Sequence, residues 1–160
     1  MKISAIPIRL LPLLVPFASW WVRERERRAL ARGVGLSEPQ MADAISAGVL
    51  SPDRVRLLTV RRIPVFEHRL LQPFAFLLRG VFATTAGLTA GHGILVCEAW
   101  RNDRRLMVHE LAHVAQYERF GGIRPFLRTY LRECLLYGYP FGSLEQEASR
   151  IAAQVTAEAP

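Results

Sequence analysis

The stretch LMVHELAHVAQYERFGG, residues 106–122, contains two histidines four positions apart, with a glutamate between them. On an α-helix, residues four apart lie one turn above each other on the same face. His109 and His113 can therefore direct imidazole nitrogens at one cation, and a zinc ion about 2.0–2.1 Å from each nitrogen fits that separation. The spacing predicts two ligands of a zinc site on one helix.

Glu110 follows the first histidine in sequence but points to another side of the helix, too far round to bind the same ion. This is the position of a general base that holds a water molecule beside a metal. The residues around the motif, 106–108, 111–112 and 114–115, are all uncharged, which predicts a helix that runs through the core beneath a cleft. The alternative is a core helix whose polar groups are satisfied without a metal.

A catalytic zinc ion takes three protein ligands and keeps a fourth position for water, so a third ligand must come from elsewhere in the chain. His68 and His92 lie upstream and are expected to be structural. Downstream, the stretch SLEQEASRIAAQ offers Glu145 and Glu147. Glu145 adjoins the apolar face of this predicted helix, whereas Glu147 is turned about 200° away and is expected to face solvent. Glu145 is therefore the expected ligand, and Glu147 is the alternative.

The sequence HELAH, followed about thirty residues later by a helix that reads ExxA, resembles the gluzincins. In that family HExxH supplies two histidines and a downstream helix supplies a glutamate. The longer pattern LTAGHGILV…HELAHVAQ…LEQEA, which includes Gln116, resembles the small zincin-like domain of extracellular contractile injection system core proteins over residues 81–155.

This resemblance implies a compact zincin-like core that binds Zn²⁺, with a small sheet packed on the HExxH helix and a ligand helix downstream. The strand before the HExxH helix would line the cleft, and a substrate peptide would lie along it by strand addition. Gluzincins of this kind usually have aspartate four residues after the ligand glutamate, where it orients a histidine. Ser149 occupies that position here, and a serine brings no charge to the imidazole.

The function that these residues predict is that of a zinc-dependent metallopeptidase. The expected metal ligands are His109, His113 and Glu145. Glu110 is the expected general base, which takes a proton from water and passes it to the leaving amine. Tyr137 and Tyr139, in the turn before the ligand helix, are the expected donors to the oxyanion, with Arg124 behind them. The alternative is a zinc-binding structural or assembly module with weak or no turnover, at a membrane surface or elsewhere.

The formal net charge of +7 comes from 21 lysines and arginines against 14 aspartates and glutamates. This balance favours acidic partners. Aromatic residues do not alternate with the arginines, and no RNA- or DNA-binding motif accompanies them, which argues against nucleic acid. The expected partners are a peptide or protein substrate and an anionic membrane surface, contacted through residues 1–28.

Residues 3–22 are apolar over the length of a membrane span. Arg9 and the prolines among them disfavour a helix across a bilayer, so an irregular hydrophobic arm is expected. There is no clear signal-peptide cleavage site, and we expect a cytoplasmic or membrane-associated protein. Cys97 and Cys134, which form no CxxC pair, are expected to be small buried hydrophobic residues.

Periodicity and capping signals predict a mostly helical α+β protein. Helices are expected at about 16–30, 37–48, 103–121, 124–137 and 143–156, and strands at about 55–61 and within 92–100. Ser143 is the expected N-cap of the last helix. Residues 1–60, which hold the hydrophobic arm and the first helices, and residues 61–160, the zincin-like core, are expected to form one compact unit.

Overall fold

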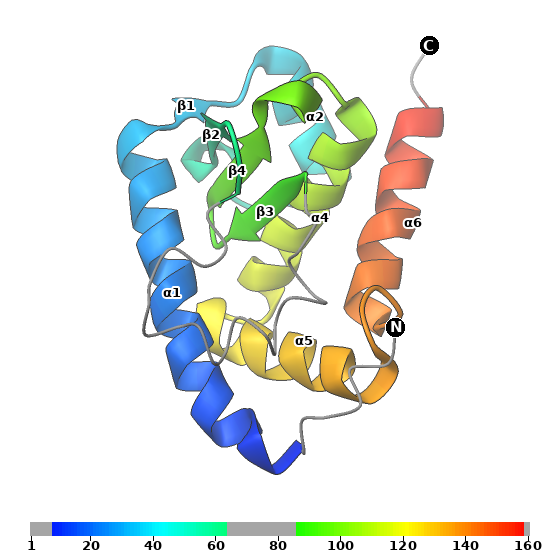
Figure 1. Cartoon of the computed structure of the whole chain (residues 1–160). Coiled ribbons are helices and arrows are strands. Elements are labelled where there is room, and N and C mark those ends of the chain that lie inside the picture. Colours follow the sequence, from blue (N-terminus) through cyan, green and yellow to red (C-terminus); the bar gives the residue numbers. More distant parts are fainter. Residues whose placement is uncertain (1–7, 64–85, 159–160) are drawn as a thin grey trace.

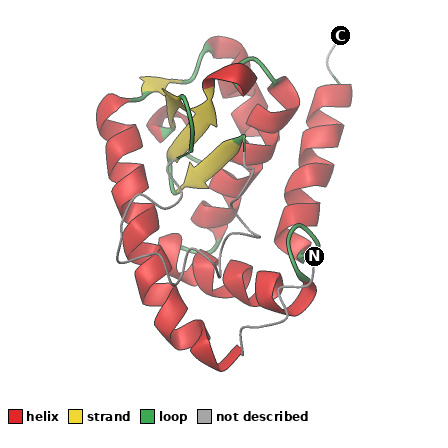
Figure 2. Cartoon of the chain, viewed as in Figure 1, coloured by secondary structure: helices red, strands yellow, loops and turns green. Residues whose placement is uncertain are grey.

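Figure 1 shows a computed structural model of the chain, in which residues 8–63 and 86–158 are described. Helices make up most of these residues, and they surround one small sheet (Figure 2). The mostly helical α+β fold that the sequence predicts is therefore confirmed.

The elements follow one another along the chain as η1 (Ile8–Leu10), α1 (Leu11–Arg32), β1 (Val34–Gly35), α2 (Glu38–Ser46), η2 (Pro52–Arg54), β2 (Arg56–Val60), β3 (Gly87–Ala90), β4 (Gly93–Cys97), η4 (Glu98–Trp100), α4 (Arg104–Arg119), α5 (Ile123–Tyr137) and α6 (Ser143–Ala157). Each predicted helix and strand is present. Two strands, β1 and β3, were not predicted, because β1 is very short and β3 lies in an uncharged, glycine-rich stretch.

The sheet has four strands in the order β1-β2-β4-β3. β2 runs parallel to β4, whereas β1 and β3 run antiparallel to their neighbours. β4 is buried on both faces: Leu95 packs into a core with α1 and α5, and Ile94 packs into a second core with α2 and α4. This alternation follows from the pleat of a strand. The sheet therefore lies between α1 and α4 (Figure 1).

α1 approaches the sheet closely because small residues meet where it crosses β4. A Cβ atom placed on Gly93 would lie 2.6 Å from the Cβ of Ala29, well inside the separation of about 3.5–4.0 Å at which carbon atoms pack. Ala29 itself is completely buried. The absence of a side chain at Gly93 thus sets the distance between α1 and the sheet.

The start of α1 differs from the prediction. The helix begins at Leu11 and not at Pro16, so the hydrophobic arm is helical from residue 8 and not irregular; residues 1–7 lie outside the described residues. Pro12 is tolerated because the first N–H groups of a helix have no partner within it. Pro16, inside the helix, removes one internal hydrogen bond.

Among the described helices, none is long and apolar enough to cross a membrane. Contact with a membrane surface through residues 1–28 stays a prediction.

The two segments expected from the sequence, 1–60 and 61–160, share a sheet and a core. β2 belongs to the first segment and pairs with β4 of the second. α1 packs against α5, and the apolar side chains of both helices belong to one core. The described parts of both segments therefore form one packed unit.

The start of α6 corrects the expected cap. Gly142 is the N-cap and Ser143 is the first helical residue. The missing cap comes from Glu133 on α5, whose carboxylate accepts the Leu144 N–H at 3.0 Å and the Ser143 hydroxyl. A carboxylate at this end satisfies free N–H groups and favours the helix dipole. This contact fixes the first turn of α6, which carries Glu145, against α5.

Adjacent leucines of α1 provide a matched test of its packing. Leu14 is 3% exposed and belongs to the core, whereas Leu13 is 67% exposed. We expect Leu14→Ala to lower the free energy of unfolding by about 2–5 kcal/mol, because it leaves a cavity. Leu13→Ala should change it by less than about 0.5 kcal/mol. Urea unfolding of the full chain measures both, and equal effects would contradict the packing of α1.

Candidate metal centre

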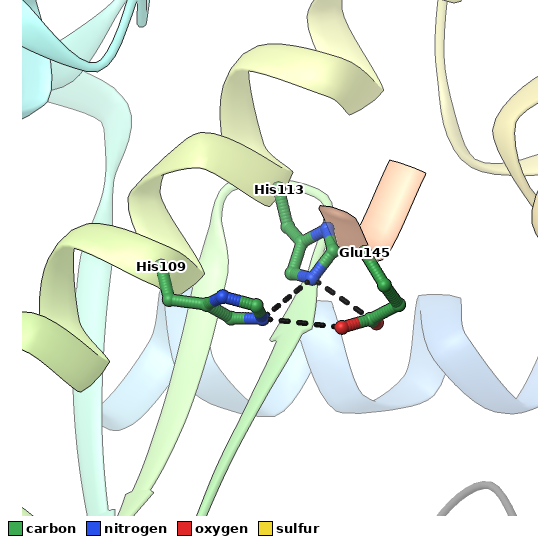
Figure 3. A group of neighbouring side chains, drawn as sticks. All are labelled: His109, His113 and Glu145. Atoms are coloured by element: carbon green, nitrogen blue, oxygen red, sulfur yellow. Dashed lines mark hydrogen bonds and ion pairs between the residues drawn. The ribbon is translucent and has the colours of Figure 1, made fainter. Parts of the chain in front are cut away.

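Helix α4 positions the two histidines of the motif. It begins at Asp103, whose carboxylate accepts the Leu106 N–H at 2.9 Å, and it passes beneath the sheet. His113 is buried and His109 is half-buried. Their Nε2 atoms lie 3.1 Å apart, and their rings meet edge to face (Figure 3). Both nitrogens thus converge on one point, as the spacing predicts.

Glu145 directs its carboxylate at both imidazoles from the first turn of α6 (Figure 3). Its Oε2 atom lies 3.3 Å from Nε2 of His109, and its Oε1 atom lies 3.4 Å from Nε2 of His113. The carboxylate is buried, and the Tyr130 hydroxyl on α5 donates to Oε1 at 2.5 Å. The structure therefore brings together the three residues that the sequence singles out as metal ligands.

The electrostatics of this group favour a positive charge. Burial alone would raise the pKa of Glu145, but the contacts with His109 and His113 and the hydrogen bond from Tyr130 outweigh burial and hold that pKa below its usual range. Burial alone would lower the pKa of His113, but the contact with Glu145 outweighs it and raises that pKa. A buried carboxylate facing two imidazoles thus attracts a proton or a cation.

The donor set and its dimensions fit a zinc ion. Two imidazole nitrogens and a carboxylate oxygen are ligands that zinc takes in catalytic sites. A tetrahedral ion with ligand distances of about 2.0–2.1 Å places its ligand atoms about 3.3–3.4 Å apart. The three separations here are 3.1, 3.3 and 3.4 Å. The hard cations Mg²⁺ and Ca²⁺ prefer oxygen ligands throughout, which this group does not offer.

Glu147, the alternative ligand, points away from the group. It pairs with Arg119 on α4 at 2.7 and 2.8 Å, and this pairing outweighs burial and lowers the pKa of Glu147. Ser149 is exposed, so it does not take the orienting role of the gluzincin aspartate. Gln116 contacts the imidazole instead, with its Oε1 atom 2.8 Å from Nδ1 of His113. The support for this imidazole comes from its own helix.

Glu110 lies beside the three ligand candidates but faces β3. Its Oε2 atom accepts the Thr89 hydroxyl at 2.7 Å, and the Thr89 Oγ1 atom also lies 2.9 Å from the carbonyl oxygen of Glu110. Gly87 leaves room for the carboxylate, because a Cβ atom there would lie 2.6 Å from Oε1. Sequence reasoning missed both β3 residues. The feature of the sequence that could have identified them is a threonine within an otherwise apolar stretch flanked by glycines.

A cavity of about 60 Å³ adjoins Glu110 and the ligand candidates. Its wall is mostly apolar and aromatic, and it is built from α1, β3, α4, α5, the turn after α5 and the first turn of α6. Among the described residues, the wall includes β3 and not β4, the predicted strand that was expected to line it. β4 pairs with β2 on one side and β3 on the other, so a substrate peptide cannot add to it as the sequence predicts. Strand addition at β3, whose four residues are buried, stays a prediction.

The tyrosines near the site divide into two groups, those that line the cavity, Tyr117, Tyr130 and Tyr139, and Tyr137, which does not. Tyr139 lines the cavity, whereas Tyr137 is 63% exposed and, like the exposed Arg124, lies outside the wall. Burial, with the charges of Glu145 and Glu110, raises the pKa of Tyr139 and keeps its hydroxyl protonated. Tyr130 also lines the cavity and was missed. A sign in the sequence was that Tyr130 places a hydroxyl among the buried apolar residues of α5.

His92 lies outside this group and has a structural contact, as expected. Its Nε2 atom is 3.0 Å from Oε1 of Glu118. The Glu118 carboxylate also accepts the N–H groups of Leu50 and Ser51, so it ties three segments together. His68 lies outside the described residues.

The cysteines do not enter the ligand group. Cys134 is buried on α5, where burial raises the pKa of its thiol to about 12. Cys97 ends β4 and is half-buried. Since the thiolate and not the thiol binds zinc, Cys134 is a neutral packing residue.

No family model matches the chain, and neither the curated proteins nor the solved structures contain a match to it. The resemblance to gluzincins stays a prediction from the residues.

The fit of Glu110 against β3 can be tested with two glycines. Gly87→Ala should lower the free energy of unfolding by about 1–3 kcal/mol, because the new methyl group overlaps the Glu110 carboxylate. Gly35→Ala is the control, since the atom nearest to its Cβ, Nη1 of Arg56, is 3.9 Å away. Thermal or urea unfolding reports both. Full stability of Gly87→Ala would place the carboxylate elsewhere.

Proposed function

We propose that this protein is a zinc-dependent metallopeptidase of the gluzincin type. One observation carries the proposal: the Nε2 atoms of His109 and His113 and the carboxylate of Glu145 converge within 3.1–3.4 Å, beside a cavity that Glu110 also lines. These three residues would hold the ion. Zn²⁺, when bound, polarises a carbonyl group and lowers the pKa of a water molecule.

Glu110 serves as the general base in this proposal. Its carboxylate takes a proton from water and passes it to the amine that leaves. The Thr89 hydroxyl fixes one carboxylate oxygen, and the bare backbone of Gly87 leaves space for the other. β3 therefore holds the base in one orientation, which a proton transfer requires.

Tyr139 serves as the donor to the oxyanion that forms on the substrate carbonyl. It lines the cavity, and its raised pKa keeps the hydroxyl proton available. Tyr130 is less suited to this role, because its hydroxyl already donates to Glu145. Tyr137, the other candidate from the sequence, is exposed and away from the cavity wall.

The substrate class is a peptide or protein. The apolar and aromatic wall of the cavity favours an uncharged side chain beside the bond that is cut.

The competing function is a zinc-binding structural module without turnover. It is favoured by the way the ligand group joins three helices: the histidines come from α4, Glu145 from α6, and its hydrogen-bond donor Tyr130 from α5. A metal there would stabilise the fold whether or not Glu110 acts.

Metal content of the purified full chain tests the ligand set. Elemental analysis should find about one zinc per chain in the wild type. His113→Ala should lose the metal, and Glu145→Ala should bind it more weakly. His92→Ala is the control, because this imidazole contacts Glu118 and not the ligand group. A wild-type chain without metal, even after zinc is supplied, would contradict the proposal.

Turnover is tested separately from metal binding. Glu110→Gln should keep zinc and lose peptidase activity. Tyr139→Phe should keep zinc and lower kcat about 10²–10³-fold, whereas Tyr137→Phe, at an exposed position, should leave kcat unchanged. Mass spectrometry of a peptide mixture incubated with each variant measures cleavage. A wild type that binds zinc but cuts no peptide would favour the structural module.

A further inference from the structure

A chain of hydrogen bonds leads from the protein surface to the side of His113 that faces away from the ligand group. It runs from Arg119 to Glu147, then to Gln116, and ends at the imidazole. Gln116, at its centre, is 1% exposed. We propose that this chain holds His113 with a proton on Nδ1, and that it thereby keeps Nε2 ready to bind a divalent metal ion.

The amide of Gln116 can take only one orientation. Its Nε2 atom lies 2.9 Å from the Leu144 carbonyl oxygen and 2.9 Å from Oε2 of Glu147. A carbonyl oxygen only accepts hydrogen bonds, and so does the Glu147 carboxylate in its two-point pair with Arg119. Both amide hydrogens are therefore donated. A flipped amide would turn its oxygen toward two acceptors and lose both bonds.

The tautomer of His113 follows from this orientation. Gln116 presents Oε1, which only accepts, at 2.8 Å from Nδ1 of His113. Nδ1 must therefore carry the hydrogen. In the neutral ring, Nε2 then has a free lone pair, and this is the atom that faces His109 and Glu145. A metal-binding histidine usually donates its other N–H in this way, which fixes the ring and increases its basicity.

Gln116 is thus a positioning residue, and the two outer residues act through it. Arg119 and Gln116 belong to α4, while Glu147 belongs to α6. Glu147 accepts from both of them on Oε2, and from Arg119 again on Oε1. More than half of the Arg119 side chain is exposed. We expect the effect on metal binding to decrease outward, from Gln116 to Glu147 to Arg119.

This inference rests on the metal-binding part of the proposed function and not on peptidase activity. The hydrogen bonds that set the tautomer join only protein groups, so the tautomer can be measured without an ion. The two ideas can therefore fail independently of each other.

Side-chain ¹⁵N NMR of the metal-free full chain, at a pH that keeps the imidazoles neutral, reads the tautomer. We expect the Nδ1–H form of His113 in the wild type and in the control Arg105→Gln, which changes an exposed arginine near the start of α4. Gln116→Met keeps the length of the buried side chain but makes no hydrogen bond, and it should give a mixture of tautomers. A wild-type His113 with its proton on Nε2 would overturn the inference, whether or not the chain binds zinc.

Competition with a chromophoric chelator measures the Kd for Zn²⁺ alone. Gln116→Met should bind zinc about 10–100-fold more weakly than the wild type, as is typical when a hydrogen-bond partner of a metal ligand is lost. Arg119→Gln should bind more weakly by a smaller factor, and Arg105→Gln should match the wild type. Equal zinc affinity in Gln116→Met and the wild type would overturn the inference.

Glu147→Ala covers the case in which Gln116→Met does not fold. It removes one acceptor of the Gln116 amide at a partly exposed position of α6. We expect a detectable share of the second His113 tautomer and a weaker affinity for zinc. A pure Nδ1–H tautomer with wild-type affinity in this variant would overturn the role of the surface pair. A wild-type chain in the Nδ1–H form that binds no zinc would support the positioning and contradict the proposed function.

Discussion

The burial of one carboxylate constrains the three C-terminal helices. A charge removed from water must be surrounded by donors or by opposite charge, because an unpaired buried charge is strongly unfavourable. Glu145 on α6 meets this need with two imidazoles from α4 and a hydroxyl from α5. α6 cannot shift by a turn along either neighbour without breaking these contacts. The same requirement gathers nitrogen and oxygen lone pairs at one point, so the stability of the helix packing and the capacity for metal binding depend on the same side chains.

Helix α4 joins this polar group to the rest of the molecule. Its ligand face meets α5 and α6, while Val108, Leu111 and Val114 on another face pack into the core that contains β4. Glu110 reaches a third direction, toward β3. A helix that is buried on several sides holds its side chains in fixed rotamers. The uncharged residues around the motif therefore hold its polar side chains in place, because they pack the helix into the core.

Much of this arrangement was predictable from local patterns, and the rest depends on contacts between distant residues. The spacing of His109 and His113 and the apolar periodicity beside Glu145 are properties of single helices, so the sequence alone places them. The bonds of Thr89 to Glu110 and of Tyr130 to Glu145 join different elements, and no spacing rule specifies them.

The expected cap at Ser143 was wrong for the same reason, since the cap comes from Glu133 on another helix. Two tyrosines close together at a helix end could not be distinguished either, because only the direction of the following turn makes one of them line the cavity.

The close crossing of α1 and β4 has a consequence for sequence variation. At that crossing there is room for one methyl group between residues 29 and 93, and here the helix supplies it. In related chains alanine on the strand is therefore expected only together with glycine on the helix and a slightly wider crossing, because a methyl group at residue 93 would also lie 3.3 Å from Cα of Glu26.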